Sequence, residues 1–199
     1  DSGISAVLSN DTYIYIGYGN GNIDIINMSD GSTTNIPELK TNELIQDKTI
    51  NSLFLHNNTL YCASNSGIFV IDLPKQEIKT LYKVSQTNAK INAITIANDS
   101  LYAATANGLF VASLKNNLLE DHNNWNLSHD IDTVCSDITT FDSKVFVALG
   151  NKDKKNMITI ISSNSAPSNL TSSSAFRGFS TNADALAIVN SNNIKIYDK

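Results

Sequence analysis

Short apolar segments alternate with polar turns along the chain, and one such unit recurs. Its clearest copy runs from Ile91 to Leu114 and reads INAITIANDSLYAATANGLFVASL. Between its two polar turns the residues are mainly Ile, Val, Leu, Tyr, Phe and Ala, the composition typical of strands. The unit therefore predicts three strands joined by two tight hairpins.

The same unit appears at four other places in the chain. Similar copies begin at Ile4 and Ile50, and more divergent ones at Cys135 and Phe176, so the spacings are 46, 41, 44 and 41 residues. A period in the forties that begins with hairpin-linked strands is typical of a β-propeller blade. We therefore predict an all-β fold, a β-propeller of five blade repeats that start near residues 4, 50, 91, 135 and 176. We expect one propeller fragment with blades of approximately 1–48, 49–90, 91–133, 134–175 and 176–199.

The turn residues explain how each unit folds back on itself. The first turn falls at Asp11 and Thr12, Asn57 and Asn58, Asn98 and Asp99, Asp142 and Ser143, and Ala183 and Asp184. Asn and Asp tolerate positive φ and bond their own backbone, which suits a two-residue hairpin. The second turn carries Gly21, Gly67, Gly108 and, in the last copy, Asn193, where we expect a left-handed residue. The fourth copy has a longer tip at 151–156.

A fourth, outer strand is predicted in each of the first four units, at 32–36, 77–84, 125–128 and 168–171. The polar linkers 37–48 and 116–124 could hold a helical turn or simply loop. The fifth copy ends at its third strand, so we predict a partial arc of a larger ring, with a self-closed five-bladed ring as the alternative. Unpaired strand edges are templates for further pairing, so we expect the chain to associate through its ends.

Composition and charge narrow the class of protein. The 199 residues are 41% hydrophobic and 17% charged, with a net charge of −5 and Arg177 as the only arginine. These values are typical of a globular protein and argue against a nucleic-acid partner, which would favour a basic face. No apolar run approaches the ~18 residues of a membrane-spanning helix. The chain has no initiator Met and opens just before a strand, so we expect a piece of a longer protein.

The sequence offers little that is typical of catalysis. Cys62 and Cys135 lie in different repeats without a CxxC pair, which argues against a disulfide framework or zinc site and indicates a buried free thiol at Cys62. His56, His122 and His129 are scattered, and we interpret them as surface histidines.

Neither the glycine-rich run nor the serines of the chain form a catalytic or phosphate-binding motif. The run GYGNGN at 17–22 joins two strands and opens no helix, so it is a turn rather than a phosphate loop. Serines are common, but no nucleophile elbow of the form GxSxG occurs.

Charged and aromatic residues in the loops receive structural interpretations. Asp130, Asp132 and Asp137 form a weak acidic cluster, which we assign to a surface loop. Trp125 could stack on a sugar, but we expect it to pack between blades. The basic tip with Lys152, Lys154 and Lys155 is interpreted as a solvated hairpin. We predict no catalytic, cofactor-binding or metal-binding residue, no cofactor, and a protein that is not an enzyme.

Several runs of residues resemble a known family. GISAV, IGYGNGNIDIIN, NIPELK, DKTIN and GIFVIDLPKQEIK, together with NNW at 123–125, are similar to the first propeller of PorZ-type proteins of the Bacteroidetes type IX secretion system. The resemblance covers roughly residues 2–127. The chain departs from it at Ser64, Asn65, Ser66 and Gly67, where a CGFG-like turn would be expected.

The resemblance implies a non-catalytic binding or scaffold propeller in a larger protein with a second propeller, a β-sandwich and a C-terminal sorting domain. Such a protein is exported to the cell surface or outer membrane. Its implied partners are other secretion and attachment-complex proteins and lipopolysaccharide glycan, with no nucleic acid and no membrane-spanning segment. We expect a ligand to meet the loops that join successive blades and the second hairpin tips.

Two other functions stay open. One is a periplasmic, oligosaccharide-sensing propeller of a hybrid two-component regulator, a class with similar repeats. The other is an enzyme with its site in the propeller funnel, since one fold supports many functions.

Overall fold

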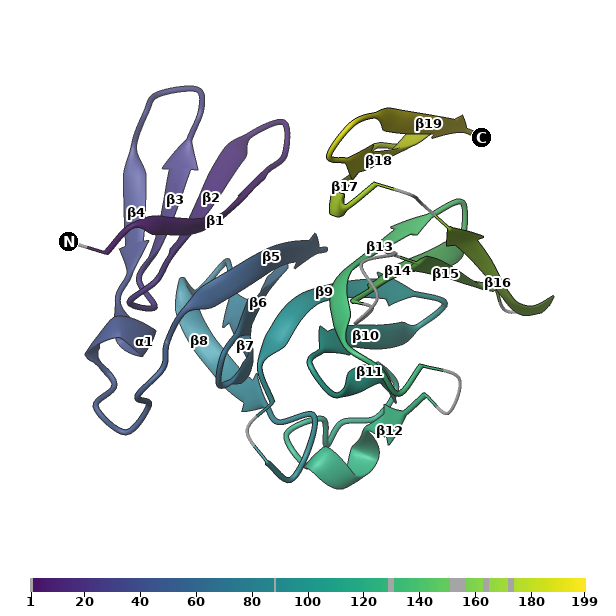
Figure 1. Cartoon of the computed structure of the whole chain (residues 1–199). Helices are drawn as coiled ribbons and strands as arrows, with labels where there is room; N and C mark the ends of the chain where they lie inside the picture. Colours follow the sequence, from purple (N-terminus) through teal and green to yellow (C-terminus); the bar gives the residue numbers. More distant parts are fainter. Residues whose placement is uncertain (1, 88, 129–130, 151–156, 163–164, 172–173) are drawn as a thin grey trace. The chain divides into compact units, whose positions relative to one another are not determined.

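The computed structural model describes residues 2–87, 89–128, 131–150, 157–162, 165–171 and 174–199. Its ordered segments are almost all β-strands, which form five antiparallel sheets (Figure 1).

The first two sheets have four strands each. The first contains β1 (Ile4–Ser9), β2 (Tyr13–Tyr18), β3 (Ile23–Asn27) and β4 (Thr33–Ile36). The second contains β5 (Ile50–His56), β6 (Thr59–Ser64), β7 (Gly67–Asp72) and β8 (Glu77–Tyr82). In the sequence, the one-turn helix α1 (Glu38–Thr41) follows the first sheet and precedes the second.

The other three sheets follow the same order. The third contains β9 (Ile91–Ala97), β10 (Ser100–Thr105), β11 (Gly108–Ser113) and the short β12 (Asn126–Leu127), which the 3₁₀ turn η1 (His122–Asn124) precedes. The fourth contains β13 (Cys135–Phe141), β14 (Lys144–Leu149), β15 (Met157–Ser162) and β16 (Ser165–Thr171). The fifth contains β17 (Phe176–Thr181), β18 (Ala185–Asn190) and β19 (Ile194–Asp198).

Within each sheet, every strand pairs with the next one along the chain, which is the arrangement of a propeller blade. The first strands of the five sheets begin at the residues where the five repeats were expected to start. The predicted all-β fold, a β-propeller with five blade repeats, is thus confirmed. That these blades belong to a larger ring stays a prediction.

The turn chemistry is also confirmed in most copies. Asn57 has φ 53°, Asn98 and Asp99 have φ 49° and 56°, and Asp142 and Ser143 have φ 48° and 58°. These residues occupy the left-handed region that their short polar side chains tolerate.

The second turns show one error in the sequence interpretation. Gly21, Gly67 and Gly108 have positive φ, at 83°, 132° and 128°, but Asn193 does not. The fifth turn is closed instead by Asn190, whose backbone N–H donates to the Asn193 carbonyl at 2.9 Å and whose side chain donates to Asn193 Oδ1 at 3.0 Å. The tip at 151–156, with its lysines, lies outside the described residues.

A bulge near the start of the first strand recurs in four sheets, and sequence patterns did not reveal it. The pairing register shifts between Ile4 and Ala6, Ile50 and Ser52, Cys135 and Asp137, and Phe176 and Gly178. A bulge bends its strand and increases the local twist. The prediction that Asp137 lies in a surface loop is wrong: Asp137 lies on β13, directly after the bulge of that strand.

The chain divides into two compact units: Asp1–Asn92 with Leu118–Trp125, and Ala93–Asn117 with Asn126–Lys199. The first two sheets share one core in the first unit. Its most buried members include Ile23, Ile36, Leu39, Ile50, Leu60 and Ile71. Because Leu39 of α1 belongs to this core, the linker after the first sheet is anchored to the body of the unit.

Candidate functional site

The first unit presents loops at both ends of its strands. In a sheet whose strands pair in chain order, alternate turns lie at opposite ends. The β1–β2, β3–β4, β5–β6 and β7–β8 turns therefore lie at one end, and the β2–β3 and β6–β7 turns lie at the other end with the linker 37–49. Figure 1 shows the β1–β2 and β3–β4 tips pointing away from α1.

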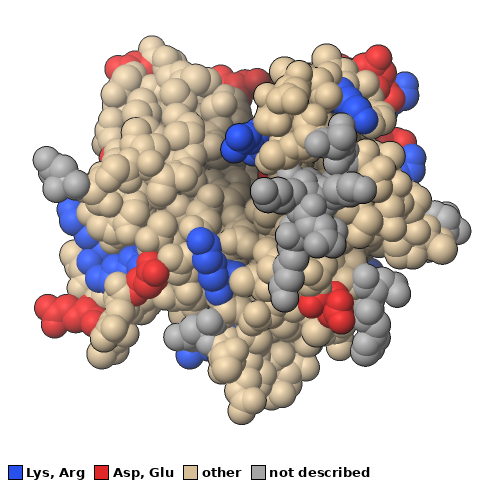
Figure 2. All heavy atoms as spheres, viewed as in Figure 1, with Lys and Arg blue, Asp and Glu red and all other residues tan. Residues whose placement is uncertain are grey.

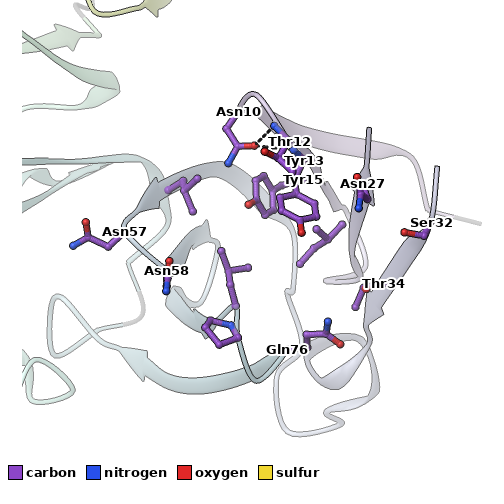
Figure 3. Close-up of a pocket in the computed structure, with 14 residues that line it drawn as sticks. Asn10, Thr12, Tyr13, Tyr15, Asn27, Ser32, Thr34, Asn57, Asn58 and Gln76 are labelled. Carbon is purple, nitrogen blue, oxygen red and sulfur yellow. Dashed lines mark hydrogen bonds between the residues drawn. The ribbon is translucent and has the colours of Figure 1, made fainter. Parts of the chain in front are cut away.

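At the end of the first hairpins lies a pocket of about 460 Å³, here called the tyrosine pocket (Figure 3). Its lining comes from the four turns and the strands beside them in both sheets: Asn10, Thr12, Tyr13, Tyr15, Ile25, Asn27, Ser32, Thr34, Leu55, Asn57, Asn58, Leu73, Pro74 and Gln76. None of these residues carries a charge. The volume lies within the ~300–1,000 Å³ range of small-molecule sites.

Two tyrosines on β2 form one wall of the tyrosine pocket. Their ring centroids lie 6.3 Å apart with the planes tilted by 50°. Tyr13 is 37% exposed and Tyr15 only 2%. Burial raises the pKa of Tyr15, and a hydrogen bond with the Asn10 side chain opposes that rise, so the phenol stays neutral at physiological pH.

Local hydrogen bonds fix the turns around the tyrosine pocket. Asn10 Oδ1 accepts the backbone N–H groups of Thr12 at 2.9 Å and Tyr13 at 2.7 Å, which closes an Asx turn. Gln76 has φ 57°, and its N–H donates to the Leu73 carbonyl at 3.2 Å. The rim is thus set by backbone hydrogen bonds together with the Asn10 side chain.

At the other end, the linker loop (residues 38–48) is attached to the β6–β7 turn. Asn65 Nδ2 donates to Asp47 Oδ2 at 2.8 Å, and Ser66 Oγ donates to the Asp47 carbonyl at 2.6 Å. Asn51 Nδ2 donates both to Asn65 Oδ1 and to the Ile91 carbonyl, each at 2.8 Å. Residues that depart from the CGFG-like turn therefore anchor the linker loop.

The electrostatics of the linker loop follow from these bonds. The hydrogen bond from Asn65 is the main reason that the pKa of Asp47 lies below its ordinary value, and the Thr49 N–H adds to the effect. Lys48 Nζ donates to the Lys40 carbonyl at 2.7 Å, which closes the loop upon itself. The result is a charged but internally bonded segment.

Open hollows flank the linker loop, and one apolar side chain projects from it. The hollows are lined by its residues together with Gly19, Asn20, Asn65 and Ser66, among others. Leu44 is 93% exposed. This end carries the linker and the second hairpin tips, where a ligand was expected; the tyrosine pocket at the opposite end was not anticipated.

The face of the molecule drawn in Figure 2 carries no large patch of like charges. Figure 2 shows small acidic and basic groups separated by uncharged residues, with both signs over the region that α1 and the linker loop occupy in Figure 1. Such a surface does not favour one sign of ligand.

Among the described residues, the structure does not bring the scattered candidates from the sequence together. His56 ends β5, and His122 lies in η1, 3.7 Å from Asp121. Asp132 is exposed, whereas the Asp137 carboxylate accepts the N–H of Phe179 at 3.3 Å. His129 and Asp130 lie outside the described residues. Among the described residues, no group of three His, Cys, Asp or Glu could hold a metal ion.

Cys62 and Trp125 have the structural roles expected of them, and Cys135 is buried as well. Cys62 and Cys135 are both buried, and burial raises the pKa of both thiols, that of Cys135 to about 12. Trp125 is buried, donates from Nε1 to the Leu119 carbonyl at 2.9 Å, and lies 6.4 Å from the Tyr82 ring of β8. It packs beside the second blade, so it is not free to stack on a sugar.

The fold places the chain in the class of β-propeller domains. The profile of the N-terminal β-propeller domain of PorZ, from the type IX secretion system, matches residues 1–126. The chain belongs to this family. No curated protein sequence matches the chain.

Solved structures agree on the fold. The chain is similar to PorZ, a surface component of the type IX secretion system of Porphyromonas gingivalis, with 22% identity and a TM-score of 0.75 over 100% of this chain and 27% of that one. It is also similar to the extracellular domain of a one-component system from B. thetaiotaomicron, with 15% identity and a TM-score of 0.68 over 98% and 27% of the two chains. A third is the WD40 domain of Neurospora crassa Pan2, with 10% identity and a TM-score of 0.67 over 99% and 63%.

The chain thus spans about a quarter of the length of the PorZ structure that it matches. Within the part of the chain that the structure describes, no helix has the length and apolar character needed to cross a bilayer.

Proposed function

We propose that the chain is a non-catalytic docking module of a PorZ-type component of type IX secretion, exported to the cell surface. The match of residues 1–126 to the PorZ propeller family is the observation that supports the proposal. Its partners are other proteins of the secretion and attachment complex.

The linker loop is the surface that we assign to a protein partner. Leu44 offers an almost fully exposed apolar side chain, and residues such as Lys40, Glu43 and Asp47 supply a polar rim. Hydrogen bonds from Asn65 and Ser66 already hold the loop, so binding would cost little ordering entropy.

The test uses the full-length protein in the bacterium that encodes it. Deleting the gene should prevent type IX cargo from being attached to the cell surface, and the wild-type gene should restore attachment. A Leu44→Asp variant should restore less cargo attachment and co-purify fewer complex components. Leu118→Asp, at a leucine that is 64% exposed elsewhere in the first unit, should behave as wild type.

Two outcomes would contradict different parts of the proposal. Unchanged cargo attachment after deletion would exclude the secretion function. Equal behaviour of the Leu44→Asp and Leu118→Asp variants would exclude the linker loop as the contact.

The sensor alternative makes a different prediction in the same strain. A sensing propeller would alter gene expression in response to an oligosaccharide and leave cargo attachment intact. Its support here is a likeness of fold at 15% identity, whereas the family match favours secretion.

A further inference from the structure

We propose that the tyrosine pocket binds a neutral carbohydrate. This site lies at the opposite end of the strands from the linker loop, and the inference does not depend on the docking surface proposed above. The chemistry of the lining, the polar groups left without partners and the rigidity of the rim all favour such a ligand.

The lining has no fixed charge to offer a ligand. Its polar members are five amides, at Asn10, Asn27, Asn57, Asn58 and Gln76, and five hydroxyls, at Thr12, Tyr13, Tyr15, Ser32 and Thr34. An anionic or cationic group entering this pocket would lose hydration without gaining a counter-charge. The ligand that suits it is uncharged and rich in hydroxyl groups.

The apolar part of the lining suits the other face of a sugar. The rings of Tyr13 and Tyr15 stand beside Ile25, Leu55 and Leu73. Figure 3 shows the two rings with Asn10 on one side and Asn58 and Gln76 on the other. A sugar presents C–H groups on the faces of its ring and hydroxyls around its edge, so it can pack against aromatic rings while it bonds to amides.

Several polar side chains of the tyrosine pocket have no partner among the described residues. The side chains of Asn57, Asn58, Thr34 and Gln76 take part in no hydrogen bond within the described part of the chain. Amides that are not used to hold the fold are available to donate to and accept from a ligand, or from the water that a ligand displaces.

The rim is preorganised by bonds that a ligand would leave intact. The Thr12 carbonyl accepts the N–H of Met28 at 2.9 Å, and the Asn58 carbonyl accepts the N–H of Leu73 at 3.1 Å. These bonds tie the first turn of each sheet to the end of its third strand. A fixed rim lowers the entropy that binding must offset.

Two sources of such a ligand share this chemistry: a soluble neutral oligosaccharide and the neutral part of a surface polysaccharide. The test exposes the natural full-length protein to immobilised neutral oligosaccharides, such as maltotriose, cellotriose, mannotriose and chitotriose. A parallel arm uses polysaccharide purified from the surface of the same bacterium. A polygalacturonate oligomer serves as the charged probe.

Variants at the two ends of β2 distinguish loss of the binding site from loss of stability. Tyr13→Ala should weaken binding of the best neutral probe at least about tenfold, because a ring face is lost. Asn58→Ala should weaken it less, and Tyr13→Phe should retain most of it. Tyr18→Ala changes the same residue type at the other end of β2, outside the tyrosine pocket, and should leave binding unchanged.

The expected outcome is saturable binding of a neutral probe that Tyr13→Ala weakens and Tyr18→Ala does not. Binding of the purified polysaccharide alone would assign the ligand to the cell surface, and binding of trisaccharides would assign a soluble source. The proposal is overturned if no neutral probe or polysaccharide binds, if the charged oligomer binds as well, or if both tyrosine variants act alike.

Discussion

Asn65 donates a 2.8 Å hydrogen bond to the Asp47 carboxylate, across 18 residues of sequence, and so ties the linker loop to the β6–β7 turn. The same Asn65 accepts a hydrogen bond from Asn51, which in turn donates to the carbonyl of Ile91. A chain of polar contacts therefore runs from the linker loop to the start of the third sheet. Because the Asn65–Asp47 hydrogen bond depends on the charge of the carboxylate, the anchoring of the linker loop should depend on pH.

Replacing Asn65 with alanine should raise the pKa of Asp47 toward its ordinary value, since the bond that favours the carboxylate is lost. A lowered folded pKa means that the anchoring is present above the unfolded pKa, near 3.9, and is lost as the pH falls through the folded value. NMR titration of the Asp47 carboxyl, with amide exchange of residues 44–48, measures both effects.

Ser66→Ala is the control for this titration. It removes the bond to the backbone carbonyl of Asp47 and leaves the carboxylate contact in place, so the pKa should stay low. An Asp47 pKa that does not move in Asn65→Ala would show that this amide does not set it.

Alanine substitutions at three glycines should distinguish the cost of a steric clash from the cost of backbone strain in the free energy of unfolding. A Cβ on Gly67, at φ 132°, would lie 2.6 Å from the Tyr82 carbonyl oxygen, whereas on Gly31, at φ 73°, it would meet nothing within 4 Å. We expect Gly67→Ala to lower the free energy of unfolding by about 2–4 kcal/mol. Gly31→Ala should cost about 1 kcal/mol from strain alone.

Gly3→Ala is the reference for these two variants, because its Cβ would lie in open space and should change little. Urea unfolding followed by the fluorescence of Trp125, the only tryptophan, gives the three values. Gly67→Ala no more destabilising than Gly31→Ala would be inconsistent with the close contact to Tyr82.

The repeats could be predicted from sequence because their signals are local. Asn and Gly adopt positive φ at little cost, as Asn98 and Gly108 do, so these residue types mark the turns in the sequence. The strands can then be predicted as the apolar segments between the turns. Asn193 shows the limit of this reasoning: a side-chain bond from Asn190 closes that turn without positive φ.

The candidate sites depend on contacts that sequence patterns do not encode. The tyrosine pocket joins residues of two sheets, from Asn10 to Gln76, and only packing of one blade on the next brings them together. One signal was present, since Asn residues gather at the first hairpin tips of both sheets. The anchoring of Asp47 by Asn65 likewise pairs two loops of irregular sequence.

Both thiols should be inert in the folded protein. Cys62 and Cys135 are buried, and burial raises the pKa of each, to about 12 for Cys135. Iodoacetamide at pH 8 should label neither thiol until urea unfolds the chain, since the thiolate is the reactive form. Rapid labelling of either cysteine without denaturant would contradict the burial.

The same pKa shifts predict a loss of stability in alkali. The unfolded thiols ionise near pH 8.5 but the folded ones do not, so stability is complete below that pH and falls as the pH rises toward the folded pKa. Above pH 8.5 the expected slope is up to about 1.4 kcal/mol per pH unit for each thiol. A Cys62→Ala, Cys135→Ala double variant should lose this slope between pH 8.5 and 9.5, where urea unfolding measures it.

The outer edge of β19 should make the 199-residue polypeptide associate. β19 pairs with β18 on one side, and in the described part of the chain no strand pairs with its other side. Ile194 and Ile196 on this strand are 63% and 68% exposed. An unpaired apolar strand edge is a template for a further strand. Sedimentation velocity should therefore show concentration-dependent oligomers.

Ile196→Lys should reduce this association, because a charge on an edge strand opposes pairing with another chain. Leu118→Lys, at an equally exposed leucine outside the strands, should not. The N–H groups of Ile194 and Ile196 face away from β18, since the hydrogen-bonded pairs of this hairpin alternate with them. Their amide exchange should be fast in dilute solution and slow on association. A monodisperse monomer whose amides at 194–197 are already protected would mean that the edge is covered within the polypeptide itself.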